Sequence, residues 1–138
     1  MMRRVGGILS VTGLGLLAGG MLLFPLFTYL AFTRLPMNVA GPFVKGCFPS
    51  YYGFMLATSG LALIGYLLRR AAWPALAPGL IIAATLWAWF WLIPQLNAYQ
   101  TAGNTAAFNR GHALSVWLDG IEFLAALALL IREGAKPG

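Results

Sequence analysis

Acidic side chains are scarce in this sequence: Asp and Glu together number three, against nine Lys and Arg, in a chain of 138 residues. Charged residues of all kinds make up 9% of the chain, where a soluble domain carries about 25%. So few charges cannot cover a globule in water, which argues against a soluble domain. Because 60% of the residues are hydrophobic, the composition indicates an integral membrane protein of one domain, residues 1–138, with the lipid bilayer as its main partner.

Cysteine and histidine are each present once, as Cys47 and His112. A single cysteine excludes an internal disulfide, and we expect this thiol to pack as a small apolar side chain. The sequence lacks a serine–histidine–acid elbow, a phosphate-binding glycine loop and a paired zinc motif, so no enzymatic activity and no cofactor is assigned. Basic residues are not interleaved with aromatic ones, and nucleic acid is therefore not an expected partner.

Long apolar runs dominate what is present. About 20 such residues cross the hydrocarbon core of a bilayer, and four runs of this kind occur, at about 5–33, 48–68, 74–93 and 106–131. They predict an all-α fold, an integral membrane four-helix bundle. The first run follows a Met-Met-Arg-Arg start, as in a signal peptide, but it is too long for one and no small-x-small cleavage site ends it. We therefore expect an uncleaved first helix.

The connections between the runs contain turn-forming residues. Residues 41–52 mix aromatics, prolines and one lysine, which predicts an interfacial turn leading into the second helix. Residues 94–105 are polar and predict a loop, with Asn104 or Thr105 capping the last helix. Pro25, inside the first run, is expected to break or kink that helix.

Basic residues gather on one side of the predicted bundle. With four spans, both termini and the middle connection share a side, which carries Arg3, Arg4, Arg69, Arg70, Arg132 and Lys136. The other side carries Arg34, Lys45 and Arg110. The positive-inside rule then places both termini in the cytoplasm. We expect the protein in the cell's inner (plasma) membrane. Arg110 is expected at the outer interface, facing water, lipid phosphate or a partner.

Aromatic residues near the outer ends of the second and third runs predict an interfacial belt, with an aromatic ligand cage as the alternative. They are Tyr51, Tyr52, Trp87, Trp89, Phe90 and Trp91. Trp117, deeper in the last run, is expected to be a packing residue. Gly15 and Gly19 form a small-xxx-small pair, which predicts close helix packing within the bundle or, alternatively, a dimer seam.

The last run contains two carboxylates in an otherwise apolar stretch. A carboxylate near the centre of a bilayer costs roughly 2.5–3.5 kcal/mol on insertion scales and usually faces a partner or a water-filled cavity. Asp119 and Glu122 are three residues apart and therefore share one helix face. His112 and Ser115 fall on the same face, and we call these four residues the polar stripe.

Four roles for the polar stripe stay open. It could hold helices together through interhelical hydrogen bonds, or serve as the relay of a small transporter or proton-linked channel element. It could instead bind haem or a metal through His112, completed by carboxylates, by Cys47 or by a second copy of the chain. Finally, it could be a contact surface in a homo-oligomer or in a larger membrane complex that has this chain as an accessory subunit.

Short motifs spread along the chain carry a family resemblance. Ile93-Pro94-Gln95-Leu96-Asn97 is followed by Ala102-Gly103 and by Phe108-x-x-x-His112-x-x-Ser115; residues 20–25 and Phe48-Pro49-x-Tyr51-Tyr52 add to the pattern. In these motifs the chain resembles the transmembrane-protein-205-like family, a membrane domain of unknown function. The family pattern has an asparagine where this chain has Asp119, and commonly a basic residue where it has Gln100. The resemblance implies a membrane fold and no settled activity.

Overall fold

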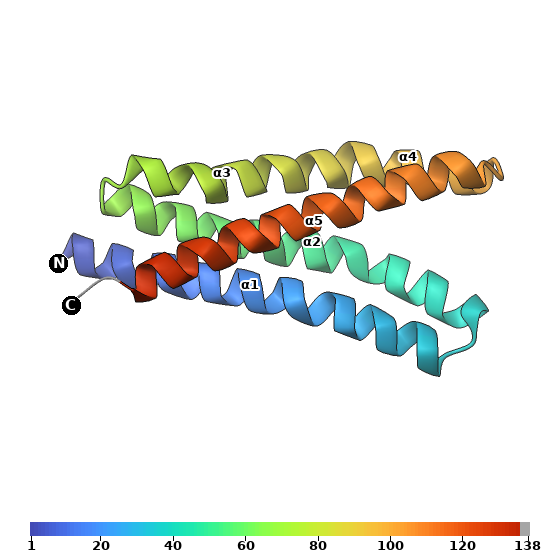
Figure 1. The fold of residues 1–138 in the computed structure, drawn as a ribbon, viewed down its shortest axis with the longest axis horizontal. Helices are drawn as coiled ribbons and strands as arrows, with labels where there is room; N and C mark the ends of the chain where they lie inside the picture. The colour runs from blue at the N-terminus through green and yellow to red at the C-terminus, as the bar shows by residue number, and fades with distance from the viewer. Residues whose placement is uncertain (136–138) are drawn as a thin grey trace.

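The computed structural model describes residues 1–135, and every regular element in that part of the chain is a helix. The elements are α1 (Met2–Arg34), α2 (Met37–Leu68), α3 (Ala72–Trp87), the π-helical turn η1 (Ala88–Leu92), α4 (Ile93–Thr101) and α5 (Thr105–Gly134). Because α3, η1 and α4 follow one another directly, four long rods run along the molecule (Figure 1). Each rod is long and apolar enough to cross a membrane, which confirms the predicted all-α four-helix bundle.

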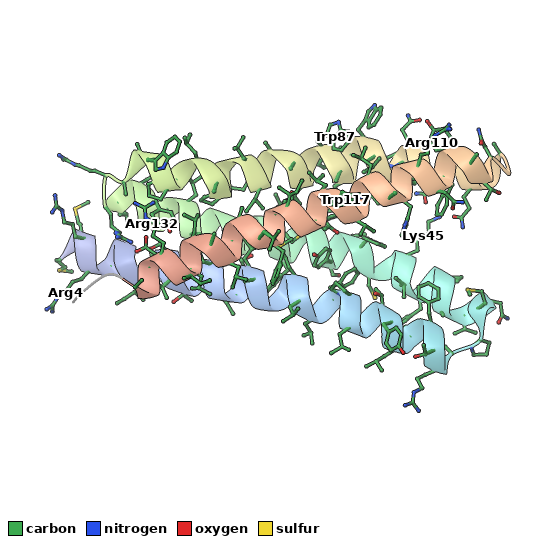
Figure 2. All side chains as sticks on the ribbon, in the orientation of Figure 1. Arg4, Lys45, Trp87, Arg110, Trp117 and Arg132 are labelled. Carbon is green, nitrogen blue, oxygen red and sulfur yellow. The ribbon has the colours of Figure 1, made fainter. Side chains whose placement is uncertain are left out.

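The two ends of the bundle carry different groups of basic residues. The start of α1 and the end of α5 lie at one end of the molecule (Figure 1), which we call the terminal end, together with Arg4 and Arg132 (Figure 2). Lys45 and Arg110 lie at the opposite end, the far end. This separation agrees with an even number of spans; Lys136 lies outside the described residues. The side of the membrane that each end faces stays a prediction.

Helices α1 and α2 approach each other closely because glycines face the partner backbone. A Cβ added at Gly13 would lie 2.5 Å from the backbone nitrogen of Ala62, and one added at Gly65 would lie 2.4 Å from that of Ser10. Gly6 faces the carbonyl oxygen of Gly65 in the same way, at 2.6 Å. These three glycines therefore define the α1–α2 seam.

Gly15 and Gly19 lie elsewhere on α1. A Cβ added at either position has no atom of another segment within 4 Å. The close approach within the bundle therefore uses a different set of glycines from the pair that the sequence pattern singled out. The alternative role of Gly15 and Gly19, a seam with a second copy of the chain, stays a prediction.

The second span begins at Met37 rather than near residue 48, so the prediction of an interfacial turn at residues 41–52 is wrong. Aromatic contacts hold the added part of α2 against α1. The ring centroids of Phe43 and Phe27 lie 5.8 Å apart, and those of Phe48 and Phe24 lie 5.4 Å apart. This packing stabilises a helix that local sequence alone does not predict.

Four prolines lie inside helices that continue past them, and one of these is Pro78 of α3. Pro25 lies within α1, and the helix continues past it to Arg34, so the proline does not break the helix. Pro42 and Pro49 lie within α2. Each proline removes one backbone hydrogen bond, and a membrane helix tolerates this where neighbouring groups or local adjustments compensate for the loss.

The third rod extends through η1 into α4, so the predicted loop over residues 94–105 is wrong for most of its length. The π-helical turn lies directly before Pro94, whose ring would clash with the carbonyl of Phe90 in a regular helix. Widening the helix at this point accommodates the proline. Only residues 102–104 connect to α5, and the Asn104 side chain accepts a hydrogen bond from the Ala107 N–H at 3.1 Å, which confirms the predicted cap.

Aromatic side chains divide between surface and core in a way that the sequence predicted only in part. Trp87 and Trp91 are exposed on the third rod, as an interfacial belt requires. Tyr51 and Tyr52, expected in the same belt, are 7% and 1% exposed, because α2 extends well beyond them toward the far end. Trp117 is 73% exposed, so the expectation that it packs within the bundle is wrong for this chain alone.

Candidate functional site

The polar stripe leads from the surface of α5 into the bundle. His112 is exposed, whereas Ser115 and Asp119 are half-buried. Glu122 is buried, with only 4% of its surface exposed. The stripe lies on the middle of α5, which crosses the bundle from α4 at the far end to α1 at the terminal end (Figure 1). Burial increases along the stripe from His112 to Glu122, which is one of the few buried residues of α5.

Two tyrosines from α2 lie near enough to the carboxyl groups of the stripe to interact with them electrostatically. Tyr51 and Tyr52 both lie within electrostatic range of Asp119 and of Glu122, and the two carboxyls lie within range of each other. We call these four residues the carboxyl–tyrosine cluster. It brings the four groups together from two helices that are far apart in the sequence, in the interior of the bundle.

Aromatic neighbours fix the tyrosine rings of the cluster. Tyr51 stacks on Phe24 of α1, with ring centroids 4.1 Å apart and an angle of 8° between the planes. Tyr52 lies 6.0 Å from the ring of Trp89 in η1. Sequence reasoning missed both tyrosines as site residues because their position in the motif at residues 48–52 suggested a belt. The missed signal is the helical continuation of α2 toward residue 37, which moves them into the middle of a span.

Several polar atoms in the interior have no hydrogen-bond partner among the described residues. They include the hydroxyl groups of Tyr52, Ser59 and Thr85 and the Oε1 atom of Glu122. A buried polar group without a partner costs about 1–3 kcal/mol. These atoms therefore mark the part of the bundle where an added proton or a small polar ligand would gain most.

The described part of the chain does not assemble a metal site, since no group of three His, Cys, Asp or Glu side chains comes together there. His112, the candidate haem or metal ligand, lies beside Phe108 of its own helix with ring centroids 5.9 Å apart. Cys47 is half-buried in α2. The carboxyl and phenol groups of the carboxyl–tyrosine cluster are able to exchange protons and to form hydrogen bonds.

Arg110 lies at the far end and lines an open cavity of about 230 Å³. The cavity lies between α4 and α5, where Gln95 and Tyr99 supply its other polar side chains. Trp91 and other apolar residues form the rest of the lining. What Arg110 faces outside the chain stays a prediction.

Arg69 ties three rods together at the terminal end. Its Nη1 atom donates one hydrogen bond to Oε2 of Glu133, at 2.7 Å, and another to the hydroxyl of Ser10, at 3.1 Å. The guanidinium also lies 5.7 Å from the ring of Tyr66, which interacts with Glu133 as well. Sequence reasoning missed this network because the ion pair joins residues 64 positions apart, and its acid lies beyond the predicted end of the last span.

Comparison with known proteins identifies a family but no activity. A family model described as a domain of unknown function, DUF4149, matches residues 12–105, more than half of the chain. No curated protein and no solved structure matches the chain. The matched residues run from α1 to the first residue of α5, so the polar stripe lies outside them.

Proposed function

The chain belongs to the DUF4149 family of domains of unknown function, and on that premise we propose that it is a small proton-linked membrane element whose working groups are Asp119 and Glu122. One observation carries the proposal. Glu122 is 4% exposed and lies in the middle of a membrane-length helix, and its Oε1 atom has no hydrogen-bond partner among the described residues. An ionisable group in such a place is a functional-site hypothesis by default.

The second carboxyl makes the site suited to holding and releasing a proton. Asp119 lies one helical turn from Glu122 and interacts with it electrostatically. Two negative charges this close repel strongly in a low-dielectric interior, so proton binding at one carboxyl is coupled to proton binding at the other. The phenol of Tyr52 can donate a hydrogen bond to a carboxylate or accept one from a carboxylic acid.

The exposure of the polar stripe gives the site a route toward the surface. Ser115 lies one turn from Asp119 and is half-buried; His112 lies one turn further and is exposed. A hydroxyl can pass a proton by accepting one and donating another, and an imidazole does the same through its two nitrogens. The proposed path therefore runs between His112 and the carboxyl pair.

Proton flux into liposomes that contain the purified protein and an internal pH-sensitive dye tests this function. We expect an imposed pH gradient to drive a flux that Glu122→Gln and Asp119→Asn each abolish and that His112→Gln slows. Glu133→Gln is the control, because it removes a carboxyl from the same helix outside the carboxyl–tyrosine cluster. It also breaks the ion pair with Arg69, so flux is compared per folded protein in every variant. Wild-type flux in both cluster variants, or equal loss in the control, would refute the proposal.

The same proposal covers the relatives of the protein, its membrane and its orientation there. We propose that it is related to the transmembrane-protein-205-like family, resides in the inner (plasma) membrane with both termini cytoplasmic, and acts without enzymatic chemistry or a bound cofactor. Its motifs at residues 93–97 and 108–115 support the first point. The concentration of arginine at the terminal end supports the orientation.

A second candidate function is that of an accessory subunit in a homo-oligomer or larger membrane complex. The observation that favours it is the outward face of α5, where Trp117 is 73% exposed and Ile121 and Leu124 are each 62% exposed. Photo-crosslinking from position 117 in native membranes tests it, with Leu22 of α1, 66% exposed, as the control position. A protein crosslinked only from position 117 supports a partner, whereas lipid adducts from both positions contradict it.

A further inference from the structure

A cleft at the terminal end combines charge with apolar surface. It has a volume of about 950 Å³ and lies between the start of α1, the α2–α3 connection and the end of α5. Arg3, Arg4 and Arg69 line it together with Glu133. Its apolar part is formed by Gly7, Val11 and Ala71. The carboxyl–tyrosine cluster contributes no residue to it, so the cleft is a separate site from the proposed proton-linked one.

Positive charge exceeds negative charge around this cleft. Glu133 is the only acidic residue at the terminal end, because the two other acids of the chain lie in the middle of α5. It pairs with Arg69. Arg3 and Arg4 are exposed on the first turn of α1 and have no acidic partner among the described residues. The excess of fixed positive charge favours an anion.

Arg69 is held in place with donors to spare. Its Nη1 atom makes both of the hydrogen bonds that this side chain forms with the described residues, to Ser10 and to Glu133. A guanidinium has five N–H donors in a fixed planar fork, so those on Nη2 and Nε remain for a ligand. Because the side chain is only 19% exposed and already anchored, little conformational entropy is lost when it binds an anion. Planar guanidinium groups match the oxygens of phosphate in particular.

The apolar part of the cleft extends along α1 toward the interior of the membrane. Arg4, Gly7 and Val11 are spaced three and four residues apart and therefore share one helix face. A Cβ added at Gly7 would have no neighbour within 4 Å, so the glycine leaves open space beneath the arginines. Val11 is 43% exposed and lies about 10 Å further along the helix axis than Arg4. A charged mouth above an apolar wall fits a phosphate that carries hydrocarbon.

We propose that this cleft binds a phosphate group, which in the membrane is the phosphate of an anionic phospholipid headgroup. The arginines hold the phosphate oxygens at the mouth, and the glycerol and first acyl carbons lie along the wall at Gly7 and Val11. A soluble phosphate ester shares the chemistry of the mouth but makes no use of the wall.

Native mass spectrometry of the purified protein, titrated with phosphatidylglycerol or with phosphatidylcholine, tests the site. We expect retention of phosphatidylglycerol in preference to phosphatidylcholine. The double variant Arg3→Gln/Arg4→Gln should weaken retention roughly 25-fold, at roughly fivefold for each arginine near a phosphate. Its matched control, Arg34→Gln/Lys45→Gln, removes the same charge at the far end and should leave retention unchanged. Equal loss in both variants would show nonspecific attraction and overturn the proposal.

Two further experiments test whether the shape of the cleft matters in addition to its charge, and whether the ligand is a lipid or a soluble phosphate. Gly7→Leu keeps every charge and fills open space, so the protein should fold and lose its preference for phosphatidylglycerol; an unchanged preference overturns the proposed cleft. Excess glycerol phosphate should leave the bound lipid in place. Displacement of the lipid would assign the mouth to a soluble phosphate ester and overturn the assignment to a phospholipid.

Discussion

Replacing Gly13 by alanine should separate α1 from α2, whereas the same change at Gly15 should not. The added methyl at Gly13 would meet the backbone nitrogen of Ala62 at 2.5 Å and the carbonyl oxygen of Thr58 at 2.7 Å. Both atoms belong to the helix backbone and cannot rotate away. Ordinary van der Waals contact begins at 3.4 Å, so the two helices must move apart by about 0.9 Å at this point.

The magnitude follows from two opposing effects. Overpacking of a well-packed site costs about 1–3 kcal/mol, and we expect the upper part of this range because the contacts are with backbone. Alanine is favoured over glycine inside a helix by about 0.8–1 kcal/mol, and this gain applies to both variants. Gly13→Ala should therefore lower the free energy of unfolding by about 1–2 kcal/mol, and Gly15→Ala should raise it by up to about 1 kcal/mol.

Unfolding in mixed micelles with increasing SDS, followed by circular dichroism, measures both variants on one scale. The difference between them does not depend on helix propensity, because propensity cancels. A difference near zero would refute the α1–α2 seam. A destabilised Gly15→Ala would leave the α1–α2 seam in place and would instead indicate a contact from outside the chain, since Gly15 has no neighbour within 4 Å in the bundle.

Three further substitutions test other parts of the structure. Asn104→Ala removes the acceptor of the Ala107 N–H and should destabilise the start of α5 by about 1 kcal/mol, seen as faster hydrogen exchange in the first turn; unchanged exchange would contradict the cap. Glu133→Gln leaves Arg69 without its charged partner and should cost about 1.5–3 kcal/mol in the same SDS titration, whereas an unchanged midpoint would contradict the network. Tyr52→Phe removes a hydroxyl without a partner and should leave stability equal or higher while slowing proton flux; a large loss of stability would show that the hydroxyl is bonded.

The four spans could be predicted from composition because each needs only length and hydropathy. Their bounds could not be predicted in the same way. Prolines at 42 and 49 suggested a turn, and Pro94 suggested a loop, yet each lies inside a continuous rod. A proline breaks a helix when nothing compensates for the lost hydrogen bond. In α2 the compensation comes from aromatic contacts with α1, and near Pro94 it comes from the π-helical turn. Only tertiary structure reveals such compensation.

Of the two helices that form the candidate site, the residues of α5 could be predicted from the sequence and those of α2 could not. The polar stripe followed from spacing alone, since residues three and four apart share a face. Tyr51 and Tyr52 could not be assigned to the site, because their burial depends on how far α2 extends and on Phe24 of a different helix. The α1–α2 seam had the same limit: Gly13 and Gly15 are equally plausible in sequence, and only the position of Ala62 distinguishes them.

Our central proposal is that Asp119 and Glu122 of α5 bind and release a proton inside the bundle. Infrared spectroscopy of the protein in lipid, recorded across a pH titration, tests this most directly through the C=O stretching band of a carboxylic acid. We expect a band that titrates, that Asp119→Asn and Glu122→Gln each remove or shift, and that Glu133→Gln leaves in place. A titrating band that survives both cluster substitutions unchanged, or the absence of such a band at every pH, would contradict proton binding at the pair.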